Sequence, residues 1–167
     1  FRRVLFRSTP TLGSFTRTGG LINITGTFNN SLQTLDIGSN GVFGTGGLNS
    51  LSGTITGGTI INSGGVAALN AVSTPHLTNV TLGNSSFPNL TVNGAIYVSG
   101  NGITLANGGT VTKDSSVWYW DGVGAQSLAV AGGGSATLTS TGGFHYAGYG
   151  VTGQTLTFAS GLTDRKS

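Results

Sequence analysis

Short runs of alternating apolar and polar residues recur along this chain at a nearly constant interval. The last residues of five such runs are separated by 23, 22, 23 and 23 positions. This first row consists of Ile37, Ile60, Leu82, Leu105 and Leu128. A second row at a similar interval consists of Leu32, Ile55 and Leu77. Repeats of roughly 20–50 residues are typical of solenoids, propellers and arrays, so the interval constrains the fold more than any other feature.

An interval of about 23 residues fits one coil of a β-solenoid, whose short strands stack on those of the next coil. We predict an all-β, parallel β-helix of about six coils, because Gly recurs every few residues and no apolar stretch keeps a helical period. The first row should point inward and stack. The residues that alternate with it should face outward: Asp36, Thr59, Thr81, Thr104 and Ser127. A β-sandwich is the alternative fold, although its antiparallel strands need not repeat at a fixed interval.

The two ends of the chain differ in character from the repeat. Phe1 to Ser8 (FRRVLFRS) resembles the translated end of a sequencing-library adapter, and Asp164 to Ser167 resembles the start of its complementary strand. Such segments are excluded from fold reasoning. We expect residues 1–8 and 164–167 to be adapter-derived and to make few contacts. Residues 9–163 are then a β-solenoid fragment of a longer protein.

The formal net charge of +3 depends on these ends, which hold five of the seven basic residues. The charged residues between them are Arg17, Lys113, Asp36, Asp114 and Asp121. Without a basic patch, no nucleic-acid partner is expected. No apolar run approaches the ~20 residues of a membrane helix, so no membrane insertion is expected. The absence of Cys from the sequence excludes disulfides and thiolate metal sites.

The repeat is rich in Gly, Thr and Asn over 24–30 (ITGTFNN), 51–60 (LSGTITGGTI), 77–82 (LTNVTL) and 101–105 (NGITL). These runs resemble repetitive exported bacterial proteins, namely autotransporter passengers and filamentous-haemagglutinin-like adhesins. The resemblance implies a right-handed parallel β-helix that is secreted or held at the cell surface, where it acts as a stalk or adhesin. It also implies surface glycans, host or matrix surfaces and adjoining coils of the parent protein as partners. It brings no shared catalytic residues.

Few side chains between the adapter-like ends can carry acid–base chemistry. The best carboxylate pair is Asp114 and Asp121, which lie up to ~20 Å apart on an extended strand, too far for paired catalysis unless the chain folds back. His76 and His145 have no Cys, Asp or second His at metal-ligand spacing, so no metal is expected. We therefore expect neither catalysis nor a cofactor.

The run Val117-Trp118-Tyr119-Trp120 stands out locally. On a strand, Trp118 and Trp120 share one face, and Val117 and Tyr119 share the other. The Trp pair either fills the core or contacts a ligand such as a sugar ring. The alternative function is therefore a carbohydrate-binding or carbohydrate-active β-helix that uses Trp118, Trp120, Asp114 and Asp121.

Thr-x-Thr pairs also occur, and on a flat solenoid face such pairs can bind ice. They stand at 54/56, 110/112, 137/139 and 155/157, so the steps from one pair to the next are unequal. Since none of these steps equals one coil of about 23 residues, we do not expect the pairs to stack on successive coils.

Overall fold

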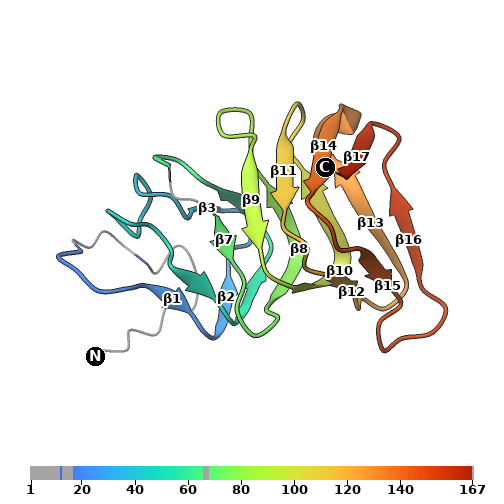
Figure 1. The fold of residues 1–167 in the computed structure, drawn as a ribbon, viewed down its shortest axis with the longest axis horizontal. Helices are drawn as coiled ribbons and strands as arrows, with labels where there is room; N and C mark the ends of the chain where they lie inside the picture. Colours follow the sequence, from blue (N-terminus) through green and yellow to red (C-terminus); the bar gives the residue numbers. More distant parts are fainter. Residues whose placement is uncertain (1–11, 13–16, 66–67, 167) are drawn as a thin grey trace.

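The computed structural model of the chain describes residue 12 and residues 17–65 and 68–166. Short parallel strands stack along one axis and enclose an apolar core (Figure 1). The described residues contain no α-helix, and one 3-10 turn spans Ala131–Gly133. The predicted all-β parallel solenoid is confirmed, and the alternative sandwich is excluded because every strand pair among these residues is parallel.

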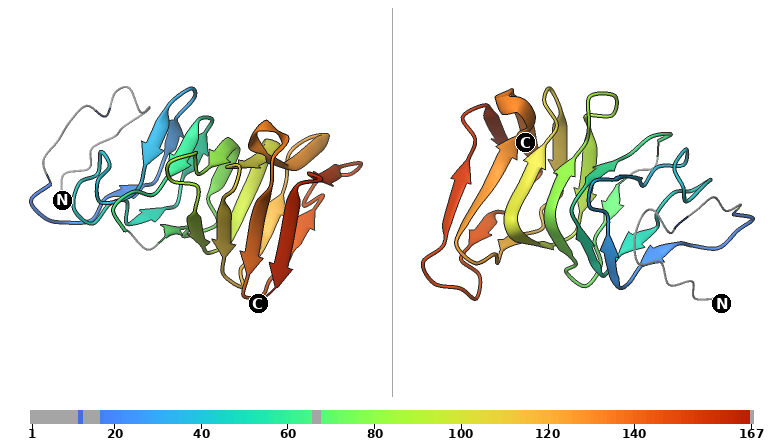
Figure 2. Two further views of the ribbon diagram at one scale, coloured as in Figure 1. Left: turned by 90° about the horizontal axis from the view of Figure 1, so that it is seen from above. Right: turned by 180° about the vertical axis from the view of Figure 1, so that it is seen from behind.

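The strands form three stacks around the core, which we call the three faces of the solenoid. The strands follow one another along the long axis of the molecule in the views from above and behind (Figure 2). The first face stacks β2 (Thr27–Asn29), β5 (Thr54–Thr56), β8 (His76–Leu82), β10 (Ile96–Leu105), β12 (Trp118–Trp120) and β15 (His145–Ala147). Strands β8 and β10 are long enough to turn a corner, so their second halves belong to the second face. The pairing register of β10 with β8 shifts at that corner, between Ser99 and Ile103.

The second face completes this sheet, and the third face is built from separate strands. The second stacks β3 (Thr34–Asp36), β6 (Thr59–Ile61), the ends of β8 and β10, β13 (Ala125–Val130) and β16 (Thr155–Phe158). The third stacks β1 (Asn23–Ile24), β4 (Ser50–Leu51), β7 (Leu69–Asn70), β9 (Leu90–Asn93), β11 (Thr110–Lys113), β14 (Ala136–Ser140) and β17 (Leu162–Lys166). A single bridge from Leu51 to Ala71 joins β4 to β7 on this face.

The first row of the repeat is buried throughout, as predicted, but its stacking differs at both ends. Ile60, Leu82 and Leu105 are paired on successive coils. Ile60 pairs on its other side with Leu35 instead of Ile37, and Leu105 pairs with Val130 instead of Leu128. Ile37 and Leu128 therefore each lie two positions along the strand from the residue that pairs in the row. A displacement of two keeps a side chain on the same face, which is why both remain buried.

The second row is correct for Ile55 and Leu77, which pair between β5 and β8. It is wrong for Leu32, which is 98% exposed at a corner with a φ of 62°. Phe28 takes the position opposite Ile55 and is buried. The spacing of apolar residues alone does not distinguish Phe28, on a strand, from Leu32, at a corner four positions later.

The outward residues behave as predicted, since Asp36, Thr59, Thr81, Thr104 and Ser127 are all half-buried. Glycine is required where neighbouring coils approach each other closely. At Gly102, with a φ of 114°, an added Cβ would lie 2.0 Å from the carbonyl oxygen of Ser127 in the next coil. Such positions tolerate only Gly and set the corners of the coil.

The expected adapter segments have different outcomes. Residues 1–8 lie outside the described residues. The expectation of few contacts is wrong for 164–166, because β17 pairs with β14 from Leu162 to Lys166. The side chains of 164–166 are exposed, so this segment joins the fold mainly through its backbone, although the charges of Asp164 and Lys166 act on the buried Lys113. Parallel pairing of backbone groups demands little of the side chains on an edge strand, which explains how such a sequence extends the sheet.

Candidate functional site

Trp118 and Trp120 lie inside the solenoid, where they are 0% and 1% exposed. The packing interpretation of the pair is therefore confirmed, and in this structure neither indole presents a ring face to a ligand. Trp120 donates a hydrogen bond from Nε1 to Nδ1 of His145, at 3.1 Å. The strand alternation was predicted correctly, and the outward aromatic ring of this strand is Tyr119.

Asp114 and Asp121 belong to two separate hydrogen-bonded networks. The Asp114 carboxylate accepts hydrogen bonds from the backbone N–H groups of Gly94 and Ser116, both at 2.9 Å. Partial burial would raise the pKa of Asp114, but these hydrogen bonds outweigh it and lower the pKa below its usual value. Asp114 thus fixes a corner of the coil as an anion.

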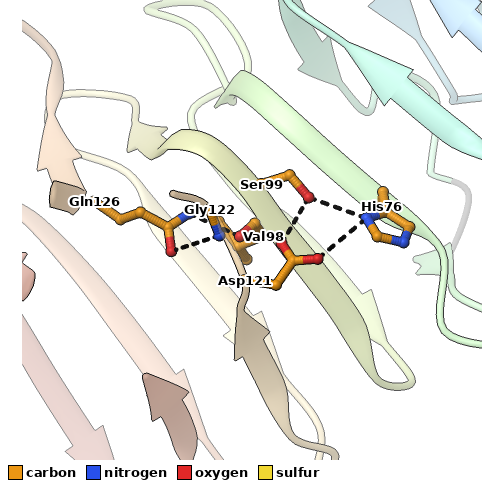
Figure 3. A network of polar contacts seen from close by, with 6 residues as sticks. All are labelled: His76, Val98, Ser99, Asp121, Gly122 and Gln126. Atoms are coloured by element: carbon orange, nitrogen blue, oxygen red, sulfur yellow. Dashed lines mark hydrogen bonds and ion pairs between the residues drawn. The ribbon is translucent and has the colours of Figure 1, made fainter. Parts of the chain in front are cut away.

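Asp121 lies on the outer surface of the first face beside His76 and Ser99 (Figure 3). Ser99 Oγ donates to Asp121 Oδ1 at 2.7 Å and lies 3.0 Å from His76 Nδ1. His76 Nδ1 is also 3.6 Å from Asp121 Oδ2. These residues come from three successive coils, because β8, β10 and β12 stack in register.

This Ser, His and Asp group does not have the arrangement of a hydrolytic triad. In such a triad, the imidazole accepts the serine proton on one ring nitrogen and is oriented by the carboxylate through the other. Here the Ser99 hydroxyl donates to Asp121, and the single nitrogen Nδ1 of His76 faces both partners. The Ser99 proton is directed to the carboxylate, and the three side chains form one polar hydrogen-bonded cluster.

The backbone after Asp121 is held from inside by Gln126, which is buried (Figure 3). Its side-chain Nε2 donates to the carbonyl oxygen of Val98 at 2.8 Å. Its Oε1 accepts from the N–H of Gly122 at 3.1 Å. Both amide groups are satisfied, which ties the end of β12 to β10 and positions Asp121.

All four tyrosines of the sequence gather beside this cluster. Tyr97, Tyr119 and Tyr146 pair on successive coils, and His76 pairs with Tyr97 on the preceding coil. Tyr149 comes from the long connection before β16, and its ring centroid lies 4.7 Å from that of Tyr119. We call these five residues the tyrosine patch.

The rings of the tyrosine patch open progressively toward the C-terminal coils. The interplanar angle is 22° for His76 and Tyr97, 37° for Tyr97 and Tyr119, and 48° for Tyr119 and Tyr146. Tyr146 and Tyr149 stand at 80° to each other and are 51% and 43% exposed. A hydrogen bond with Tyr149, with a smaller contribution from burial, raises the pKa of Tyr97 above its ordinary value.

Sequence reasoning missed this patch, although part of its signal was present. His76, Tyr97 and Tyr119 follow one another at nearly the interval of the repeat. Tyr146 follows after a longer step, and Tyr149 reaches the patch only through the folding of its loop. The sequence-based hypothesis for ligand contact named the Trp pair, which lies on the inward face of β12, and did not name Tyr119 on its outward face.

Polar groups also enter the core of the later coils. Lys113 is 1% exposed and occupies the inward position that Val92 holds on the preceding coil. Its Nζ donates to the carbonyl oxygens of Ser116 at 2.7 Å, Asp114 at 3.2 Å and Gly142 at 3.3 Å. Burial lowers the pKa of Lys113, and burial together with this nearby cation lowers the pKa of His145 to about 4.

The Thr-x-Thr pairs correct another expectation. Thr110 pairs with Thr137 and Thr112 pairs with Thr139, so two pairs do stack on successive coils. The two pairs lie on successive coils, although the number of residues between them exceeds the repeat interval of about 23. The extra residues lie in the connections between strands and do not change the pairing. A polar threonine array therefore covers part of the third face.

Within the described part of the chain, no three His, Cys, Asp or Glu residues group to hold a metal ion. Those residues also include no helix of the length and apolarity that a membrane crossing requires. Comparisons of the chain with protein-family models, with curated proteins and with solved structures give no match.

Proposed function

We propose that this chain is a structural, non-enzymatic segment of a large exported or cell-surface bacterial protein, where it acts as a stalk or adhesin. The supporting principle is that a solenoid gains length by adding coils, each of which buries its apolar side against its neighbours. The sequence is rich in Thr, Ser, Asn and Gly, a composition that suits prolonged exposure of the outer surface to solvent.

The observation that carries the proposal is the open C-terminal end of the solenoid. Phe158 pairs with the inward-facing Leu128, yet it is 45% exposed, and Phe144, just before β15, is 61% exposed. Among the described strands, β15, β16 and β17 each have a partner on one side only. Unpaired strand edges with exposed apolar residues favour the addition of further strands, so this surface is suited to stacking against another β-coil, as a stalk requires.

Coil duplication tests the structural part of the proposal. Leu82 and Leu105 hold equivalent positions on successive coils, so a second copy of residues 83–105 inserted after Leu105 adds one coil. Three extra copies should leave a folded chain that is about 14 Å longer by small-angle X-ray scattering. An unfolded product or an unchanged length would contradict the proposal.

Cell-surface exposure is tested separately in bacteria that carry the gene. Brief treatment of intact cells with a protease that does not enter them should release peptides from residues 17–163. Release only after cell lysis would contradict the surface location. A cytoplasmic protein of known location provides the control for intact cells.

A carbohydrate-active β-helix is the second candidate, and the carboxylate of Asp121 beside exposed aromatic rings favours it. Asp121 has no carboxylate partner in its network, whereas most glycosidases use two. A screen of the purified chain against polysaccharides should detect no turnover. Turnover that is abolished by Asp121→Asn and kept by Asp36→Asn would establish the enzyme instead.

A further inference from the structure

We propose that the tyrosine patch binds an uncharged polysaccharide chain that lies along the solenoid axis. The inference rests on the adhesin form of the proposed function and supplies its ligand class and binding residues. The starting observation is that the four tyrosines of the sequence come from three stretches of the chain, namely β10, β12 and β15 with the connection that follows it, and meet on one outer face. Core packing does not account for this, because Tyr146 and Tyr149 are about half exposed.

Ring orientation shows where a ligand would make contact. At the His76 end the rings are stacked, with centroids 4.7 Å apart, so their faces cover each other. At the other end, Tyr146 and Tyr149 are nearly perpendicular and leave ring faces exposed. Aromatic rings combine a large apolar face with a polar hydroxyl, which suits the apolar face and hydroxyl rim of a sugar ring.

Polar groups flank the rings where sugar hydroxyls would lie. Asp121 is 21% exposed and His76 is 40% exposed in their side chains, and both point to the outer surface (Figure 3). Asp121 accepts hydrogen bonds, and a histidine ring both donates and accepts them. A few convergent polar groups beside aromatic rings are the usual composition of a small-molecule site.

The charges around the tyrosine patch favour an uncharged ligand over an acidic one. The patch is flanked by one carboxylate, that of Asp121, and Lys113 is buried inside the solenoid. An acidic polysaccharide would be repelled by Asp121 and would find no lysine or arginine among the patch residues to compensate. The stacked row from His76 to Tyr146 crosses four successive coils, a span of about 14 Å that fits several linked sugars.

The test is affinity electrophoresis of the full chain through gels that contain dextran, galactomannan, xyloglucan or mixed-linkage glucan, with alginate as the acidic comparison. At least one neutral polysaccharide should retard the chain, and alginate should not. Tyr146→Ala and Tyr149→Ala should each weaken the retardation about 3- to 10-fold, given the usual worth of one aromatic contact. Tyr149→Phe, which keeps the ring, should weaken it less, and Leu32→Ala at the opposite end should leave it unchanged.

A second measurement applies to the unmutated chain, so that unfolding of a variant cannot decide the outcome. Addition of the retarding polysaccharide should shift the NMR signals of isotope-labelled tyrosine rings. Retardation by no neutral polysaccharide, equal retardation of all variants, or unshifted tyrosine signals would each overturn the inference. None of these results bears on coil duplication, which tests the stalk function without any ligand.

Discussion

The two ends of the solenoid use the same alternation of inward and outward residues but differ in how well it buries them. Phe28, on the first strand of the first face, is 2% exposed, whereas Phe158, on the last strand of the second face, is 45% exposed. Both point toward the core on short strands that pair on one side only, β2 with the following coil and β16 with the preceding one. The difference shows that burial in a solenoid depends on cover from both sides, so the stability of a coil is largely a property of its neighbours.

The interior also changes in character along the axis. On the third face, the inward column reads Leu69 and Val92, then Lys113 and Ser140. The earlier part gains stability from apolar burial, and the later part depends on satisfied hydrogen bonds around a buried cation.

Truncation of the two matched phenylalanines should give the largest contrast. Phe28→Ala removes a buried ring and should lower the free energy of unfolding by about 3–5 kcal/mol. Phe158→Ala removes a half-exposed ring and should cost less than about 1 kcal/mol. Urea unfolding followed by Trp fluorescence measures both. Equal losses would show that the C-terminal end is covered in solution.

Acidification should destabilise the later coils through His145. Its pKa falls from the ordinary 6.5 to about 4 in the folded chain, so the unfolded chain binds a proton first as the pH drops. Stability should therefore be lost between pH 6.5 and 4, with unfolding free energy about 2 kcal/mol lower at pH 4.5 than at pH 7. Protonation also removes the acceptor for Trp120 Nε1.

Substitution of each of the two histidines shows which one causes this pH effect. His145→Gln should flatten the dependence of unfolding free energy on pH between 7 and 4.5. His76→Gln, at the outer surface, should retain the dependence. A slope that survives in His145→Gln would assign the effect to another group.

Replacement of the buried lysine should cost about 1–2 kcal/mol. Lys113→Met keeps the length of the side chain but leaves the carbonyl oxygens of Ser116 and Gly142 without this donor. Arg165→Met, at an exposed position on the edge strand β17, should change stability by less than about 0.5 kcal/mol. A more stable Lys113→Met variant would mean that the cost of burying the cation exceeds the value of its hydrogen bonds.

Removal of residues 164–167 should have the smallest effect, about 1 kcal/mol or less. The described side chains of this segment are exposed, so the main loss is that of the edge hydrogen bonds to β14, and the opposite effects of Asp164 and Lys166 on Lys113 are lost together. Thermal unfolding of the shortened chain checks this. A loss of several kcal/mol would show that β17 protects the end of the core.

Much of the fold could be predicted from the sequence, because both the alternation within strands and the length of a coil appear as periodic patterns of apolar residues. The inward direction of Ile60, Leu82 and Leu105, the shared face of Trp118 and Trp120, and the parallel stacking all follow from periods of two and about 23. The candidate site was predictable only in part. The alternation placed Tyr119 opposite the Trp pair, but it did not indicate which face would carry the ligand-accessible rings.

The sequence alone determined which residues share a side of each strand, because adjacent strand residues point to opposite sides whatever their neighbours are. Only the tertiary structure decided which residues meet. A lengthened coil moved the partner of Ile60 to Leu35, a still longer coil stacked Thr110 on Thr137, and a looped connection brought Tyr149 onto Tyr119. The physical reason is that extra residues are absorbed in the corners and connections. They change the pairing between coils and leave the alternation within each strand intact.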